Sequence, residues 1–242
     1  MPIEEPYTDL TTSPGFYPFV HVTSGSEEVN SSIFLVEGTD AIVDWVFLEL
    51  RDKADPKIVL ATRAALIQRD GDIVDLDGVS PVIFSSSQDD YYLAVRHRNH
   101  LGVMSAEPIS LSRYSNAPAV YDFTDPATPT WGLNAQRILG DYAVMWGGNA
   151  DANGFIVYQG SGVAIPDSDF IFFEIFLDPL NTSNSFNHIL YGYRTGDTNL
   201  DGEVRYQGLD NDIDVLIFFN VLFHPENVNS FINFFITEQI PK

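Results

Sequence analysis

The residues best suited to chemistry form one short loop in the C-terminal half of the chain. Asp197, Asn199 and Asp201 occupy positions one, three and five of this loop, and Gly202 occupies position six. Alternating side-chain oxygens of this kind converge on one calcium ion, and the glycine permits the sharp turn. The main-chain carbonyl of Glu203 offers a further oxygen at position seven. The spacing therefore predicts a Ca2+ site.

This loop departs from the usual calcium pattern at its closing ligand. Position twelve is Gly208 instead of an acid, so we expect Asp212 or Asp214 to close the loop across the inserted residues 206–208. A solvated turn is the alternative interpretation, because Asp and Asn also favour turns that bind no metal.

A second copy of the loop lies upstream, because residues 148–160 align with residues 196–208. Its candidate ligands are Asn149, Asp151 and Asn153, with Asp167 and Asp169 beyond them. Fewer of these ligands are charged, so we expect weaker calcium binding here. The similarity continues along the chain and defines two repeats, at about 147–193 and about 195–239, each of which should bury its apolar face against a neighbour.

An apolar run follows each pair of acids, at residues 170–177 and 215–223. Asp at the start of each run and Pro179 or Pro225 past its end favour a short buried helix. Strands are the alternative, because both runs are rich in Phe and Ile.

Residues 1–118 indicate a β-sandwich domain, because β-branched and aromatic runs alternate there with turn residues. A polar linker at residues 112–118 separates this domain from the two-repeat calcium-loop module of residues 119–242. The predicted fold class is mainly β, with short helices and strands in the C-terminal module. The predicted strands are Phe16–Val22, Ser32–Val36, Ala41–Leu50, Ile58–Gln68, Val82–Ser85, Tyr91–Arg98 and Pro108–Leu111.

A small hairpin is expected between Arg69 and Pro81. The pairs Asp70-Gly71 and Asp77-Gly78 favour tight turns with positive φ. The alternative is a further cation site, formed by the acids of this segment: Asp70, Asp72, Asp75 and Asp77.

Two arginines are expected on one face of the strand at residues 91–98, because side chains alternate along a strand. We expect Arg96 and Arg98 to pair with Asp44 or Glu49 on the neighbouring long strand. Capture of a ligand is the alternative.

The charge balance restricts the partners. The chain has 12 Lys and Arg against 34 Asp and Glu, a formal charge of −22, which would repel nucleic acid and anionic membranes. Bound calcium would reduce the resulting self-repulsion. No apolar run is long enough for membrane insertion, and the acidic start is unlike a signal peptide, so an export signal would have been removed or lie upstream.

The loop at residues 196–202, with the apolar segment after it, resembles the dockerin type of calcium repeat, in which a half EF-hand loop leads into a helix. The whole chain is similar to the C-terminal regions of large surface and secreted proteins of Bacteroidota. Residues 42–51, 66–81 and 91–100, the paired loops and the ending at residues 238–241 carry this resemblance. It implies a cell-surface or extracellular location, Ca2+ as cofactor, and export by a type IX secretion route.

The residues favour a non-enzymatic function. No nucleophile with a base is visible, and the five histidines lack metal-site spacing; they are His21, His97, His100, His188 and His224. We therefore expect a structural or adhesive surface module. Its partners would be other surface-protein domains or copies of itself.

Self-assembly into a filament is suggested by the apolar segment Phe231–Thr237, which would complete another subunit's sheet. An ordinary edge strand within one chain is the alternative for this segment. Two further functions stay open. One is a glycan-binding module, suggested by Trp45, Trp131 and Trp146, and the other is a sorting and anchoring region for secretion.

Overall fold

The computed structural model describes residues 29–112, 118–160 and 165–242. Strands account for 29% of the protein and helices for 12%, which confirms the mainly β fold class. The sheets of the described residues are antiparallel. The predicted strand Phe16–Val22 lies outside the described residues. Within these same ranges, every helix is too short or too polar to cross a membrane.

The chain forms two compact units, and neither is one continuous stretch. Among the described residues, the sheet unit takes in 29–97, 102–145 and 239–242, and the repeat unit takes in 98–101 and 146–238. The predicted division near residue 118 stays a prediction.

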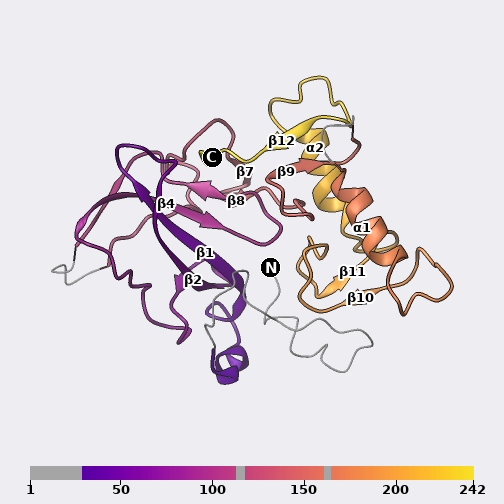
Figure 1. The fold of residues 1–242 in the computed structure, drawn as a ribbon, viewed down its shortest axis with the longest axis horizontal. Coiled ribbons are helices and arrows are strands. Elements are labelled where there is room, and N and C mark those ends of the chain that lie inside the picture. The colour runs from indigo at the N-terminus through magenta and orange to yellow at the C-terminus, as the bar shows by residue number, and fades with distance from the viewer. Residues whose placement is uncertain (1–28, 113–117, 161–164) are drawn as a thin grey trace. The chain divides into compact units, whose positions relative to one another are not determined.

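A six-stranded antiparallel sheet organises the sheet unit, in the order β3-β2-β1-β4-β5, with β6 also paired to β4. Its three long strands, β1, β2 and β4, are labelled in Figure 1. The central strand β1 is buried along almost its whole length, as expected for a strand with a partner on each side. A separate hairpin is formed by β7 (Gln136–Leu139) and β8 (Tyr142–Met145). The sheet consists of β1 (Ile42–Asp52), β2 (Val59–Gln68), β3 (Ile73–Val74), β4 (Asp89–Arg96), β5 (Val103–Met104) and β6 (Ile109–Leu111).

The predicted hairpin between residues 69 and 81 is confirmed. Gly71 and Gly78 both have positive φ, at 101° and 78°. The first turn brings β3 back onto β2, with Leu66 opposite Val74. The second turn lets Val74 bridge to Pro81.

Two predicted strands are wrong. Ser32–Val36 lies mostly in a 3-10 helix, η2 (Ser31–Leu35), because Asn30 caps its start by accepting the Ser32 N–H at 3.0 Å. Val82–Ser85 joins no sheet, because its carbonyl at Ile83 is taken by the Arg63 side chain instead of a neighbouring strand.

The predicted pairing of Arg96 is confirmed, and that of Arg98 stays a prediction. Arg96 contacts Glu49 at 2.6 Å, and Glu49 also pairs with Arg51 at 2.7 Å. Asp44 pairs with His97 at 3.2 Å. Arg98 lies beyond the end of β4, in the repeat unit, where it meets another acid.

The repeat unit contains the two predicted helical segments around one core. The first is α1 (Asp167–Phe176), whose first turn carries Asp167 and Asp169, where the helix dipole favours negative charge. The second begins as a π-helix, η3 (Ile213–Phe218), and continues as α2 (Phe219–Phe223). Helix prediction at residues 170–177 and 215–223 is thus confirmed. The core includes Ile156, Ile171, Ile175, Val204, Ile217 and Val221.

The strands of the repeat unit are exchanged between the repeats. Strand β10 (Leu190–Tyr191), from the end of the first repeat, pairs with β11 (Glu203–Val204) in the loop of the second. Strand β12 (Phe235–Thr237), from the end of the second repeat, pairs with β9 (Phe155–Val157) after the loop of the first (Figure 1). Part of the segment Phe231–Thr237 therefore already has a partner within its own chain.

Candidate calcium loops

Loop 2, defined as residues 197–205 together with Asp212, is shaped by bonds between its side chains and its own backbone. Asp197 accepts the N–H of Asp201 at 3.0 Å and that of Gly202 at 3.1 Å. Asn199 also accepts the Asp201 N–H, at 2.9 Å, and Asp201 accepts the Glu203 N–H at 2.9 Å. The chain thus curls around the oxygens of positions one, three and five.

Loop 1, defined as residues 149–157 together with Asp167, has three equivalent bonds at the same positions. Asn149 accepts the Gly154 N–H at 3.3 Å, and Asp151 accepts the Asn153 N–H at 3.2 Å. Asn153 accepts the Phe155 N–H at 2.7 Å. The backbone agrees, because position four has φ of 57° in loop 1 and 64° in loop 2, at Ala152 and Leu200.

One buried carboxylate closes each loop. Asp212 accepts the Thr198 N–H through Oδ1 and the Arg205 N–H through Oδ2, both at 2.7 Å. Asp167 makes the equivalent bonds, to the N–H groups of Ala150 and Val157, also at 2.7 Å. Each closing acid therefore ties the start of its loop to the strand after it.

The other two predicted closing acids lie outside the loops. Asp169 and Asp214 are exposed. Asp214 accepts a bond from the Asn211 side chain at 3.0 Å. Glu203 pairs through its side chain with Arg205, so only its main chain is placed for position seven of loop 2.

The two closing acids, Asp167 and Asp212, are buried close to other acids of their loops. Burial, with a smaller contribution from the charge of nearby Asp151, raises the pKa of Asp167 to about 8. Burial also raises the pKa of Asp212 well above its usual range, with the charges of Asp197 and then Asp201 acting in the same direction. A cation at either loop would offset this repulsion.

The donors present suit a hard cation. Each carboxylate has several lone pairs, so one that accepts backbone N–H groups can still bind a metal. In the part of the chain that the structure describes, no three His, Asp or Glu side chains form a metal-holding group by themselves. A cation in these loops would therefore also need amide and main-chain oxygens, which calcium accepts and softer metals do not prefer.

Sequence reasoning missed two residues from residues 98–101 that hold loop 2. Arg98 is buried, lies 4.4 Å from the ring centre of Tyr193, and contacts Asp197 at 3.3 Å. Asn99 donates from Nδ2 to the carbonyls of Thr195 and Asp197, at 3.0 and 2.5 Å. No spacing rule reveals residues so far upstream, and a structure is needed to find them.

The acids of the Arg69–Pro81 hairpin serve other roles. Asp75 holds the Arg63 guanidinium with both oxygens, at 2.5 and 2.6 Å. Asp77 accepts bonds from the Ser80 hydroxyl and from the N–H groups of Ser80 and Val79, which lower the pKa of Asp77 to about 2. Asp75 is thus held by a cationic side chain, and Asp77 supports the second turn of the hairpin.

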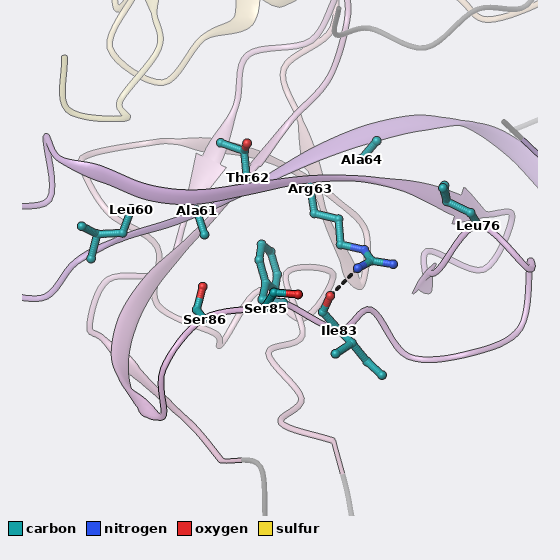
Figure 2. A pocket seen from close by; sticks show the side chains of 10 residues that line it. Leu60, Ala61, Thr62, Arg63, Ala64, Leu76, Ile83, Ser85 and Ser86 are labelled. Atoms are coloured by element: carbon teal, nitrogen blue, oxygen red, sulfur yellow. Dashed lines mark hydrogen bonds between the residues drawn. The ribbon is translucent and has the colours of Figure 1, made fainter. Parts of the chain in front are cut away.

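A cavity of about 470 Å³ lies beside the outer part of β2 (Figure 2). Figure 2 shows Arg63 reaching across it to the carbonyl of Ile83. Its remaining lining is apolar or hydroxylic: Leu60, Ala61, Thr62, Ala64, Leu76, Phe84, Ser85 and Ser86. The titratable side chain among these residues, Arg63, is already bound by Asp75.

The three tryptophans are packed inside their units. Trp45 and Trp146 are each 3% exposed. Trp131 is half-buried and meets the Tyr92 ring edge-on, at 5.4 Å between ring centres. These positions give the glycan-binding alternative no specific support.

The chain matches no protein-family model, and comparison with curated proteins and with solved structures gives no match either.

Proposed function

We propose that this protein is a calcium-stabilised, non-enzymatic structural module of a cell-surface or extracellular protein. In this proposal a sandwich-like sheet unit carries a dockerin-like repeat unit with two calcium loops. The main support for this proposal is that both loops are closed in the same way. Asp167 and Asp212 each accept two backbone N–H groups at 2.7 Å, one at each end of the loop. The same acid is thus buried at the same place in both copies of the loop.

Stabilisation follows from the energetics of buried charge. A buried carboxylate near other carboxylates opposes folding unless a cation or a proton neutralises it. Calcium would bind the folded loops and leave the unfolded chain, which lacks the assembled oxygens, almost unbound. The net charge of −22 adds to the benefit of bound cations.

The test is thermal unfolding in millimolar calcium and in chelator, with bound calcium counted by native mass spectrometry. We expect two calcium ions and a clear rise in melting temperature, because calcium at 100 times its dissociation constant adds about 2.7 kcal/mol per site. Asp212→Asn should lose much of this shift. The matched control Asp214→Asn should keep it, because Asp214 is exposed and outside the loop.

Two results would count against the proposal. One is a melt that does not respond to calcium, with no metal counted. The other is an equal loss in Asp214→Asn and Asp212→Asn, which would mean that the closing geometry does not select the ligand.

A further inference from the structure

A single buried residue, Asn99, contacts both loops. Its main-chain oxygen accepts the N–H groups of Gly148 and Asn149, at 3.0 and 2.9 Å, where loop 1 begins. Its side chain donates to Thr195 and Asp197, where loop 2 begins. Asn99 is 0% exposed. The entrances of the two loops are therefore joined through one residue that belongs to neither repeat.

The helix of the second repeat packs on the entrance of loop 1. A Cβ added to Gly148 would lie 2.9 Å from Cγ1 of Ile217. Asn220, which is 1% exposed, donates to the Gly147 carbonyl at 2.7 Å. This helical segment begins directly after Asp212, the closing acid of loop 2.

The helix of the first repeat packs on the entrance of loop 2 in the same way. A Cβ added to Gly196 would lie 2.5 Å from Oε2 of Glu174 and 3.5 Å from Cγ1 of Ile171. This helix begins at Asp167, the closing acid of loop 1. Each closing acid thus sits at the start of the helix that shapes the other loop.

The exchanged strands add a third connection. The Gly154 carbonyl of loop 1 accepts the Glu238 N–H at 2.9 Å, and the Gly202 carbonyl of loop 2 accepts the Gly192 N–H at 2.9 Å. Each of these bonds joins a loop to the end of the other repeat. A cation that fixes the conformation of one loop would therefore also stabilise the bonds that hold the other loop.

We propose that the two loops are coupled calcium sites and that Asn99 is the positioning residue that links them. This inference depends on the proposed calcium function. Loop 2 has three carboxylates, Asp197, Asp201 and Asp212, against two in loop 1, and the Arg98 guanidinium offsets one of them at Asp197, so each loop offers a cation a similar net charge. By linkage, each site then raises the affinity of the other by the same factor.

The test is a calcium titration of the full chain followed by amide NMR, with the Gly154 resonance reporting loop 1 and the Gly202 resonance reporting loop 2. Asp201→Ala, a change at an exposed residue, removes one carboxylate from loop 2 and weakens its affinity for calcium. We expect this change to raise the Kd of loop 1 about ten-fold, within the usual range of site-to-site coupling. In an Asn99→Ala background the same change should raise the loop 1 Kd by clearly less than ten-fold, because the side-chain link is gone while the helix and strand connections remain.

Asn181→Ala is the matched control. Asn181 is also a buried asparagine, and it donates to the Ile175 and Ser185 carbonyls without touching either loop. In this background we expect the full ten-fold effect of Asp201→Ala. If Asn99→Ala loses its dispersed amide spectrum, Asn99→Leu removes the donor while keeping a side chain of similar size.

The inference is overturned if Asp201→Ala leaves the loop 1 Kd unchanged, or if the effect is as large without the Asn99 side chain as with it. Failure of the underlying calcium function looks different. In that case neither glycine resonance of the unmodified protein responds to calcium.

Discussion

His224 and Asp178 occupy equivalent places in the two repeats but differ in chemistry. His224 accepts the Glu226 N–H through Nδ1 at 3.2 Å, and Asp178 accepts the Leu180 N–H at 2.7 Å. His224 is 6% exposed and packs against the Trp146 ring at 4.8 Å between ring centres. Burial lowers the pKa of His224 below its usual 6.5, with the charge of Glu226 acting in the opposite direction.

This shift predicts an acid-sensitive contribution to stability. Because the pKa of His224 is lower in the folded chain, the unfolded chain takes up a proton more readily. Stability is therefore complete above the ordinary pKa of 6.5 and falls as the pH drops through it. We expect the melting temperature in saturating calcium to fall between about pH 7.5 and about pH 5.5.

His224→Asn is the control for this prediction, because asparagine can accept the Glu226 N–H without gaining a charge. Its melting temperature should fall less over the same pH range. An equal fall in both proteins would show that another group titrates.

The candidate ligands could be predicted from the sequence because their spacing is local. Positions one, three, five and six identify the turn of loop 2 directly, and the repeat extends it to loop 1. The choice between Asp212 and Asp214 could not be made, because it depends on which one the helix start buries. Arg98 and Asn99 were unpredictable, since only folding brings them to residues almost a hundred positions away.

At the level of elements, Gly148 and Gly208 allow the packing of loop 1 to be tested. Both have similar positive φ, 112° and 101°, so alanine is strained at each. Only at Gly148 would a Cβ meet Ile217, and nothing lies within 4 Å at Gly208. We expect Gly148→Ala to be less stable than Gly208→Ala by roughly 1–3 kcal/mol, the usual cost of overpacking, in urea unfolding. Equal losses would mean that Ile217 yields without cost.

The elements themselves were predicted unevenly. Strands β1, β2 and β4 were found because each contains a run rich in β-branched, aromatic and other apolar residues that is bounded by turn residues. The second helical segment contains a detail that no pattern indicates. Asp167 aligns with Asp212 and Phe172 with Phe218, so the second repeat has one extra residue between them, and the π-helix η3 accommodates it. The strand predicted at Ser32–Val36 failed because the Asn30 cap outweighed β propensity.

At the level of the whole molecule, the charge of −22 opposes contact between copies of the chain. We expect light scattering in chelator and low salt to give the mass of one chain. Millimolar calcium and about 0.15 M salt should permit association, because the Debye length falls to about 8 Å. A single chain under both conditions, even at high concentration, would contradict the proposed self-assembly.

The arrangement of the chain into two units was the part of the fold least accessible to prediction. Composition changes near residue 118, but the chain passes between the units after residues 97, 101, 145 and 238. Turn residues and apolar runs indicate local structure only. They do not indicate where the chain passes from one unit to the other. From the sequence, residues 98–101 therefore resemble the end of a strand, although Asn99 among them contacts both loops.

The final crossing has a consequence for how the protein folds as it is made. Ile240 is 3% exposed and packs with Tyr92, Ala94 and Met104 in the sheet unit, and the Pro241 carbonyl accepts a bond from Arg51 at 2.8 Å. During translation, these residues leave the ribosome only after residues 146–238 of the repeat unit. The sheet unit, whose strands emerge first, thus completes its core last, and its folding finishes after translation of the loops rather than before it.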